Sequence, residues 1–221
     1  MKLLTEAILK FALGVTLIAG LLLIPAGTWL YWNAWLLMGL LFIPMFIAGL
    51  MMLKKNPNLL RSRLNAKEKA GEQQLVVKLS GLMFLLGFIT AGLDFRFGWS
   101  HLPKGLIIAA CAAFLLAYAL YAEVLRENVW LSRTIEVQEY QKVVDTGLYG
   151  IVRHPMYAVT FLLFGTMPLI LGSLPALLIF LFYPFIIAKR IRSEEQILSQ
   201  ELEGYTDYCK RVKYRLIPFV W

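Results

Sequence analysis

The fold is decided by residues 11–53, which read FALGVTLIAGLLLIPAGTWLYWNAWLLMGLLFIPMFIAGLMML. These 43 residues contain no Asp, Glu, Lys or Arg, and residues 156–188 form a second uncharged run of 33. One membrane-spanning helix needs only about 20 apolar residues, so runs of this length indicate a chain that crosses a bilayer more than once. The period-2 alternation of a membrane β-barrel does not occur in the sequence, so we expect the spans to be helices.

The composition of the whole chain agrees with this interpretation. Of its 221 residues, 59% are apolar and 16% are charged, whereas soluble domains have about 45–50% apolar and about 25% charged residues. A net charge of +8 would suggest a nucleic-acid partner in a soluble protein. In a membrane protein, topology and anionic lipid headgroups explain the same charge, so we expect no nucleic-acid partner. The two cysteines form neither a disulfide framework nor a metal-binding spacing, and we predict no metal site.

Turn-forming residues divide the apolar runs into about six predicted spans. Pro25 and Gly27, which lie near interfacial aromatic residues, divide the first run in two. The second run would make one helix of about 50 Å, against a hydrocarbon core of about 30 Å. Pro168, Gly172 and Pro175 therefore predict a short helical hairpin. The first four spans are predicted at about 8–29, 34–53, 77–97 and 104–124, all within residues 1–125, and the last two form the hairpin 156–188.

The positive charges indicate how these spans are oriented. With a cytoplasmic N-terminus, all Lys and Arg residues except Arg96 and Lys104 fall on the cytoplasmic side, as the positive-inside rule requires. The chain is thus predicted to be an all-α, multi-pass integral membrane protein with a single membrane domain over residues 1–221 and both termini cytoplasmic. Most polar residues then gather in a basic loop 54–78, a connector 126–155 and a C-terminal tail 189–221. Topology and headgroup attraction explain the basic loop, so we expect the chemistry in the other two segments.

The connector contains a motif suited to binding an anion. It ends with GLYGIVRHPMY over residues 147–157, where two glycines permit tight turns. Pro155 is suited to the first position of a helix, which places Arg153 and His154 at a helix N-terminus, where a carboxylate is favoured. The alternative is that Arg153 is a topogenic charge and His154 an interfacial polar residue.

The C-terminal tail carries an acidic pair, Glu194 and Glu195. Apolar residues recur in the tail at the 3–4 residue spacing of one helix face, and Glu195 shares that face. A carboxylate on an inward face needs a basic or ammonium partner. Glu194 points about 100° away and follows Arg190 by four residues, as in a surface ion pair. The alternative is that the pair is the solvated first turn of a helix that begins near Ser193.

Together these elements resemble the C-terminal half of the isoprenylcysteine carboxyl methyltransferase family, which is related to membrane phospholipid N-methyltransferases. The resemblance covers about residues 142–218 and is specific because separated elements occur in the same order. Ala158 departs from the pattern, since many relatives have glycine there, but it is small enough for the same fold. Residues 1–125 resemble the family only as hydrophobic spans. The shared elements are the motif at 147–157, Arg190, Glu194 and Glu195, Tyr205, Tyr208, Val212, and Ile217 with Pro218.

The resemblance implies an integral membrane methyltransferase that uses S-adenosylmethionine. The methyl donor would lie in a cytoplasmic pocket within a methyltransferase-like region, residues 126–221, roofed by the connector and a C-terminal amphipathic helix. A lipophilic acceptor would enter between helices from the membrane lipids. It would be the carboxylate of a prenylated cysteine or, alternatively, a phospholipid or small-amine nitrogen. A carboxylate is already ionised near neutral pH and needs no base.

By the same resemblance, residues of the two cytoplasmic segments receive roles. His154 and nearby backbone would bind the carboxylate of the donor, and the acidic pair would bind its ammonium, with Glu195 placed first because it faces inward. Arg190 or Arg153 would orient the acceptor, and Glu195 joins them as a candidate catalytic residue. The predicted cofactor-binding set is Gly147, Tyr149, Val152, His154, Tyr157, Glu194 and Glu195.

Two other classes are compatible with the sequence. A sterol-reductase-like NADPH enzyme would share a similar C-terminal membrane fold, but the connector shows no additional phosphate-binding cluster. A non-catalytic membrane protein, such as a small transporter or an assembly factor, would retain a degenerate pocket. An acidic relay within the spans would support transport, but the spans contain almost no acidic residue besides Asp94 near an outer end. We interpret Glu123, Arg126 and Asn128 as the end of the fourth span.

Overall fold

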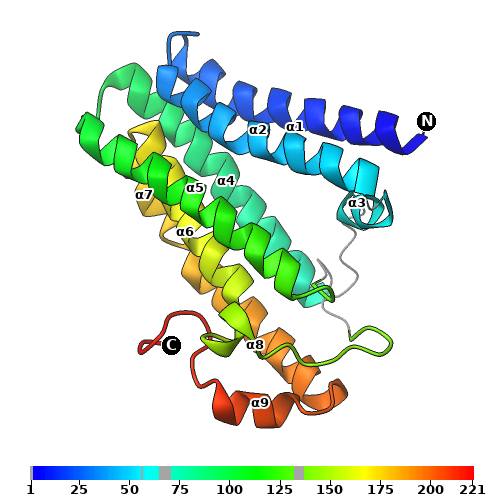
Figure 1. Cartoon of the computed structure of the whole chain (residues 1–221). Coiled ribbons are helices and arrows are strands. Elements are labelled where there is room, and N and C mark those ends of the chain that lie inside the picture. Colours follow the sequence, from blue (N-terminus) through cyan, green and yellow to red (C-terminus); the bar gives the residue numbers. More distant parts are fainter. Residues whose placement is uncertain (1, 56, 65–70, 132–136) are drawn as a thin grey trace.

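The structure is a computed structural model, and it describes residues 2–55, 57–64, 71–131 and 137–221 (Figure 1). Within these ranges every regular element is a helix, which confirms the all-α prediction. Parts of the basic loop, residues 56 and 65–70, and residues 132–136 of the connector lie outside the described residues. The elements are α1 (Lys2–Ala26), α2 (Trp32–Lys55), α3 (Pro57–Leu64), α4 (Gly71–Phe97), α5 (Lys104–Glu127), η1 (Gly147–Gly150), α6 (Pro155–Leu171), α7 (Leu174–Phe180), α8 (Tyr183–Glu201) and α9 (Tyr205–Arg211).

Five helical segments of the described chain are long and apolar enough to cross a membrane. They are α1, α2, α4, α5 and the nearly continuous pair α7 and α8, which together cover Leu174–Glu201. The apolar helix α6 is shorter, with 17 residues. At 1.5 Å per residue it measures about 26 Å, against about 30 Å of hydrocarbon. The prediction of about six spans thus corresponds to five long spans and one short helix.

The hairpin predicted at 156–188 is present, but its second arm is longer than expected. Its turn lies at Gly172, which has a φ of +77°, and at Ser173, whose hydroxyl accepts a hydrogen bond from the Ala176 N–H. The helix α8 continues unbroken past Ser193, so no separate helix begins there. The sequence contains no glycine or proline between residues 185 and 201. The charges that begin at residue 189 therefore mark a change of environment and not a helix end.

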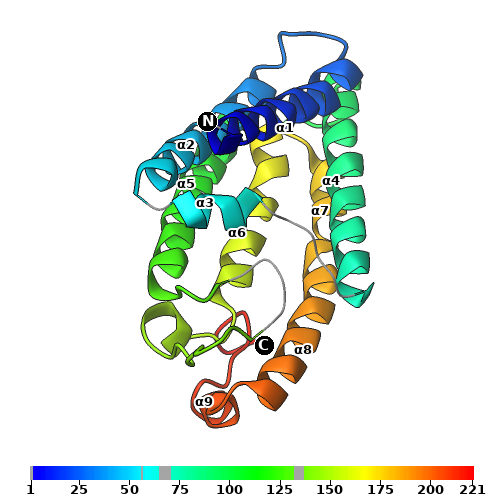
Figure 2. The same cartoon turned by 90° about the vertical axis from the view of Figure 1, so that its right-hand side faces the viewer.

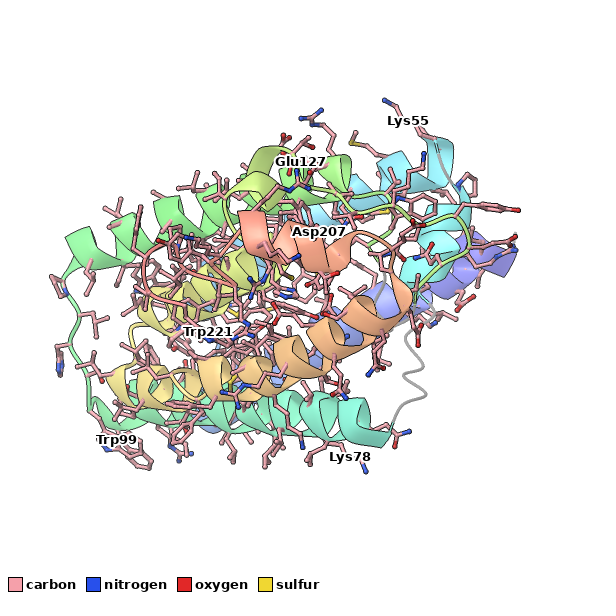
Figure 3. The ribbon with its side chains drawn as sticks, turned by 90° about the horizontal axis from the view of Figure 1, so that it is seen from below. Lys55, Lys78, Trp99, Glu127, Asp207 and Trp221 are labelled. Carbon is pink, nitrogen blue, oxygen red and sulfur yellow. The ribbon has the colours of Figure 1, made fainter. Side chains whose placement is uncertain are left out.

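The helices pack so that both polar segments reach the same end of the bundle. Among the described helices, the most extensive contacts join α6 to α5 and α1 to α4, and α7 and α8 lie along α4 (Figure 2). Phe84 packs edge-on against Phe164 and Phe180, which ties α4 to both arms of the hairpin. Seen from below, Trp99 lies at one end of the bundle and Glu127 and Asp207 lie toward the other (Figure 3). The polar end holds the connector, the end of α8, and α9.

The opposite end of α6 is fixed by hydrogen bonds from an earlier part of the chain. The Tyr31 hydroxyl donates to the Leu171 carbonyl oxygen, and the Asn33 side-chain amide donates to the Ile170 carbonyl oxygen, both at 2.7 Å. Nearby, the buried Asp94 accepts hydrogen bonds from the Ser100 N–H and hydroxyl. Polar groups inside a membrane need partners within the protein because water is absent. Asp94 therefore has a structural role, remote from the polar end.

Candidate functional site

The turn η1 places Tyr149 at the polar end of the bundle and is tied to α5. Both carboxylate oxygens of Glu127 accept a hydrogen bond from the Leu148 N–H, at 3.1 and 2.9 Å. Gly147 has a φ of +54°, a conformation that favours glycine, and a Cβ atom there would overlap the Glu127 carboxylate. The predicted tight turn is present, and Gly147 is needed both for its backbone and for this close approach.

We expect Gly147→Ala to lower the thermal unfolding midpoint of the detergent-purified chain. The left-handed conformation costs an alanine about 1–2 kcal/mol, and the new methyl group would also displace Glu127 from the turn. Gly105→Ala in α5 is the control, because a Cβ atom there meets no atom within 4 Å. Equal unfolding midpoints for the two variants would show that the turn does not depend on Gly147.

The backbone of Arg153 and His154 is held by residues 212–221, the C-terminal segment that follows α9. The Arg153 N–H donates to the Tyr214 carbonyl oxygen and the His154 N–H donates to that of Arg215, both at 2.9 Å. Pro155 is the first residue of α6, as predicted. The buried His154 side chain thus lies at the positive end of the α6 dipole, and residues about 60 positions later in the chain fix its position.

Glu195 is surrounded by basic side chains of the protein itself. Its Oε1 accepts a hydrogen bond from Arg153 Nε at 2.7 Å and lies 3.3 Å from His154 Nε2, while its Oε2 accepts one from Arg215 Nε at 2.7 Å. Arg153 also donates to two backbone carbonyl oxygens of the C-terminal segment. Glu195 is 9% exposed. This Glu195 cluster, formed with Arg153, His154 and Arg215, joins the connector, α8 and the C-terminal segment.

Glu194 lies next to this cluster and belongs to a second group of hydrogen-bonded side chains, the Glu194 group, formed with Tyr157 and Arg190. Its Oε2 accepts a hydrogen bond from the Tyr157 hydroxyl at 2.6 Å, and the Tyr157 hydroxyl accepts one from Arg190 Nε at 2.9 Å. Its Oε1 lies 4.0 Å from His154 Nδ1, beyond hydrogen-bond distance. The Tyr157 hydroxyl therefore bridges Arg190 and Glu194, so the two residues are more than the plain surface ion pair suggested by their spacing.

The Glu194 group lines a pocket of about 800 Å³, a volume that includes the solvent space at its open mouth. Connector, α6, α8 and α9 all contribute side chains to it. Of the residues singled out from the sequence, Tyr149, Arg153, His154, Tyr157, Arg190 and Glu194 line the pocket, whereas Gly147, Val152 and Glu195 are not part of its lining.

The pocket also contains residues to which the sequence assigned no role. Asn128, interpreted as part of a helix end, does cap α5, but it lines the pocket as well. Tyr205 and Tyr208 belong to the family-like elements, and their three-residue spacing on one helix face was the available signal. The lining residues between positions 130 and 144 carry no recognisable motif. The other lining residues are Trp130, Leu131, Gln141, Lys142, Val143, Val144, Met156, Leu198 and Leu202.

Burial sets the ionisation of the pocket tyrosines. It raises the pKa of Tyr149 to about 12, and it also raises the pKa values of Tyr205 and Tyr208. All three phenols are therefore neutral near pH 7 and can donate hydrogen bonds. The Tyr208 hydroxyl donates to the Tyr149 carbonyl oxygen at 2.7 Å, which links α9 to η1.

Within the described ranges, no group of three or more His, Cys, Asp or Glu residues is arranged to hold a metal ion.

The fold and the pocket define a multi-span membrane protein with a pocket lined by polar residues at one end of its helix bundle. Residues 106–200 match the model of the Isoprenylcysteine carboxyl methyltransferase (ICMT) family. The match confirms the family resemblance and covers less than half of the chain. It begins in α5, and so reaches into residues 1–125, where we expected only general hydrophobicity. It ends before Tyr205 and Tyr208.

Two curated relatives are similar to part of the chain. The Delta(14)-sterol reductase TM7SF2 of Mus musculus is 32% identical over 91 residues, which are 40% of this chain and 22% of the reductase. The nickel-cobalt-cadmium resistance protein NccN of Alcaligenes xylosoxydans xylosoxydans is 32% identical over 89 residues, which are 38% of this chain and 40% of that protein. The chain thus spans less than half the length of either relative.

Proposed function

We propose that this chain is an integral membrane methyltransferase that uses S-adenosylmethionine and acts on a lipophilic acceptor. The observation that supports this function best is the polar pocket at one end of the bundle, with Glu194, Tyr157, Arg190 and His154 in its lining. These four residues all fall within residues 106–200, the part of the chain that matches the methyltransferase family.

The residues present in the pocket fit the methyl donor, which carries an ammonium, a carboxylate, an adenine ring and a sulfonium. Glu194 supplies a carboxylate for the ammonium, while His154 and the positive end of α6 favour the carboxylate. Tyr149 and other aromatic residues of the lining, such as Trp130 and Tyr208, offer apolar surface for the adenine ring. We assign the ammonium to Glu194 and not to Glu195, because three basic side chains of the protein already engage Glu195.

In the proposed reaction, the main task of the protein is to align the methyl donor and the acceptor. When bound, S-adenosylmethionine supplies an electrophilic methyl group, which passes to the acceptor as the sulfonium becomes the thioether of S-adenosylhomocysteine. An acceptor carboxylate is ionised near neutral pH, so its alignment is the main requirement. Arg190, in the pocket lining, is our choice for orienting it. Arg153 is less suitable because Glu195 and backbone carbonyls engage it.

We further propose that the acceptor reaches the pocket from the lipid on the cytoplasmic side, where the distribution of Lys and Arg predicts both termini. The helix α8 carries Arg190 and Glu194 and is part of a candidate membrane span. The family resemblance makes the carboxylate of a prenylated cysteine the first candidate, with phospholipid or small-amine nitrogens as alternatives. Mass spectrometry of lipid extracts incubated with a labelled methyl donor should find the label in a lipid. Label only in water-soluble compounds would contradict a lipid route.

An NADPH-dependent reductase is the second candidate, because of the similarity to a sterol reductase. Its cofactor carries phosphates and needs cationic groups in the pocket. The cationic lining residues are Lys142, Arg153 and Arg190. Arg153 is already engaged by Glu195, so Lys142 and Arg190 would have to hold all the phosphates of this cofactor. We therefore rank the reductase below the methyltransferase.

Calorimetry on the detergent-purified chain separates the two candidates. We expect S-adenosylhomocysteine to bind with a saturable heat and NADPH to give none under the same conditions. A ligand at 100 times its Kd stabilises the folded state by about 2.7 kcal/mol, so a raised thermal unfolding midpoint is a second readout. Binding of NADPH without binding of S-adenosylhomocysteine would overturn the methyltransferase proposal in favour of the reductase.

A further inference from the structure

The helix α9 presents two tyrosines to the pocket, and only one of them has a hydrogen-bond partner. Tyr205 and Tyr208 are both buried, and their ring centroids are 5.7 Å apart. The Tyr208 hydroxyl donates to the Tyr149 carbonyl oxygen at 2.7 Å. The Tyr205 hydroxyl has no partner, and in the described part of the chain it is the only buried side-chain polar atom of which this is true.

A buried hydroxyl without a partner is unfavourable for folding, because it has lost its hydrogen bonds to water and gained none. The Cys209 thiol, one turn further along α9, lies near the Tyr205 hydroxyl and interacts with it. A thiol is only a weak hydrogen-bonding group, and the geometry between the two side chains does not make a hydrogen bond. Tyr205 is 4% exposed and lines the pocket. A ligand in the pocket can supply the hydrogen bond that this hydroxyl lacks.

The surroundings of Tyr205 indicate which part of a ligand would meet it. Tyr205 packs in a buried cluster with Leu202, Tyr208 and Val212. Arg153, which pairs with Glu195, also donates a hydrogen bond to the Val212 carbonyl oxygen, so this cluster borders the charged end of the pocket. Burial keeps its phenol neutral, because it raises the pKa well above the ordinary value. A neutral hydroxyl in such a place can donate to a carboxylate or accept from an ammonium.

We infer that the Tyr205 hydroxyl binds the amino-acid end of the methyl donor, meaning its carboxylate and ammonium. This inference rests on the proposed function and adds a positioning residue that lies outside the part of the chain matched to the family. With Glu194 on α8 and His154 at the start of α6, Tyr205 on α9 would hold the donor by three separate elements.

Tyr205→Phe tests the inference by separating binding from stability. We expect the affinity for S-adenosylhomocysteine, measured by calorimetry, to fall at least about tenfold, the lower end of the effect of one lost hydrogen bond to a charged group. The affinity for 5′-methylthioadenosine, which lacks the carboxylate and ammonium, should not change. The thermal unfolding midpoint without ligand should stay equal or rise, because the variant no longer buries an unsatisfied hydroxyl.

Tyr208→Phe is the matched control, since it removes a hydroxyl that has a partner within the protein. It should lower the unfolding midpoint without ligand and weaken both ligands alike. If wild type binds S-adenosylhomocysteine and Tyr205→Phe binds it equally well, the inference is wrong and the proposed function stands. If Tyr205→Phe instead behaves like Tyr208→Phe, the hydroxyl is structural and the inference is also wrong. If wild type binds no S-adenosylhomocysteine, the proposed function itself fails.

Discussion

Glu195→Gln is expected to lower the stability of the folded chain and to abolish detectable binding of S-adenosylhomocysteine. The substitution removes the negative charge shared by Arg153, Arg215 and His154. Removing one partner of a buried ion pair typically costs about 3–5 kcal/mol, because the remaining charges stay buried without a counter-charge. The Arg215 side chain is 35% exposed, so water can compensate part of the loss. We therefore expect the lower end of this range, measured by thermal or denaturant unfolding in detergent.

The effect on binding follows from the position of the Glu195 cluster. Its members Arg153 and His154 line the pocket, although Glu195 itself does not. Without the carboxylate, the two guanidinium groups repel each other and the C-terminal segment loses its link to α8. Glu123→Gln is the control, because Glu123 also pairs with an arginine but lies exposed on α5. Exposed ion pairs contribute little, so this variant should resemble wild type. Equal stability of the two variants would contradict the role of the cluster.

Glu194→Gln is expected to give the opposite pattern, with stability retained and binding lost. Glutamine has the same size and keeps an oxygen that accepts the hydrogen bond from the Tyr157 hydroxyl, but it has no charge. A hydrogen bond to a charged group contributes about 1.5–3 kcal/mol, so the affinity for S-adenosylhomocysteine should fall about 10- to 150-fold. Calorimetry measures the affinity, and the unfolding midpoint without ligand should stay within error of wild type.

A truncated ligand makes the Glu194 experiment specific. 5′-Methylthioadenosine has no ammonium, so wild type and Glu194→Gln should bind it equally. Unchanged affinity of the variant for S-adenosylhomocysteine would remove Glu194 from the ammonium site. A lowered unfolding midpoint would assign Glu194 a structural role instead. The two experiments would thus distinguish the adjacent glutamates. Glu195 would stabilise the packing of the connector, α8 and the C-terminal segment, and Glu194 would bind the ammonium of the ligand.

Much of the fold could be predicted because its signals are local. Uncharged runs, the break at Pro25 and Gly27, and the turn at Gly172 each depend on a few neighbouring residues. The length of α8 could not be predicted in the same way. Hydropathy falls sharply at Lys189, and this marks where polar surroundings begin, but a helix without glycine or proline can continue through such a change.

The sequence could predict which residues gather at the site, but not what Glu194 and Glu195 each contact there. Pro155 at a helix start, with Arg153 and His154 before it, follows from local sequence. Helical periodicity places Glu195 inward, but it cannot show that Arg215, 20 residues later, reaches its second oxygen. Nor can it show that the Tyr157 hydroxyl draws Glu194 into the pocket. These contacts depend on tertiary structure.

The helix α6 depends on earlier residues to complete its hydrogen bonds at the end remote from the pocket. The carbonyl oxygens of Leu171 and Ile170 accept from Tyr31 and Asn33, which precede them by 140 and 137 residues. A chain is synthesised from its N-terminus, so these donors are already in the membrane when the short helix leaves the ribosome. The N-terminal spans are therefore available to complete the hydrogen bonds of α6 as it packs against them. Helices without any recognisable substrate motif thus support the half of the chain that carries the pocket.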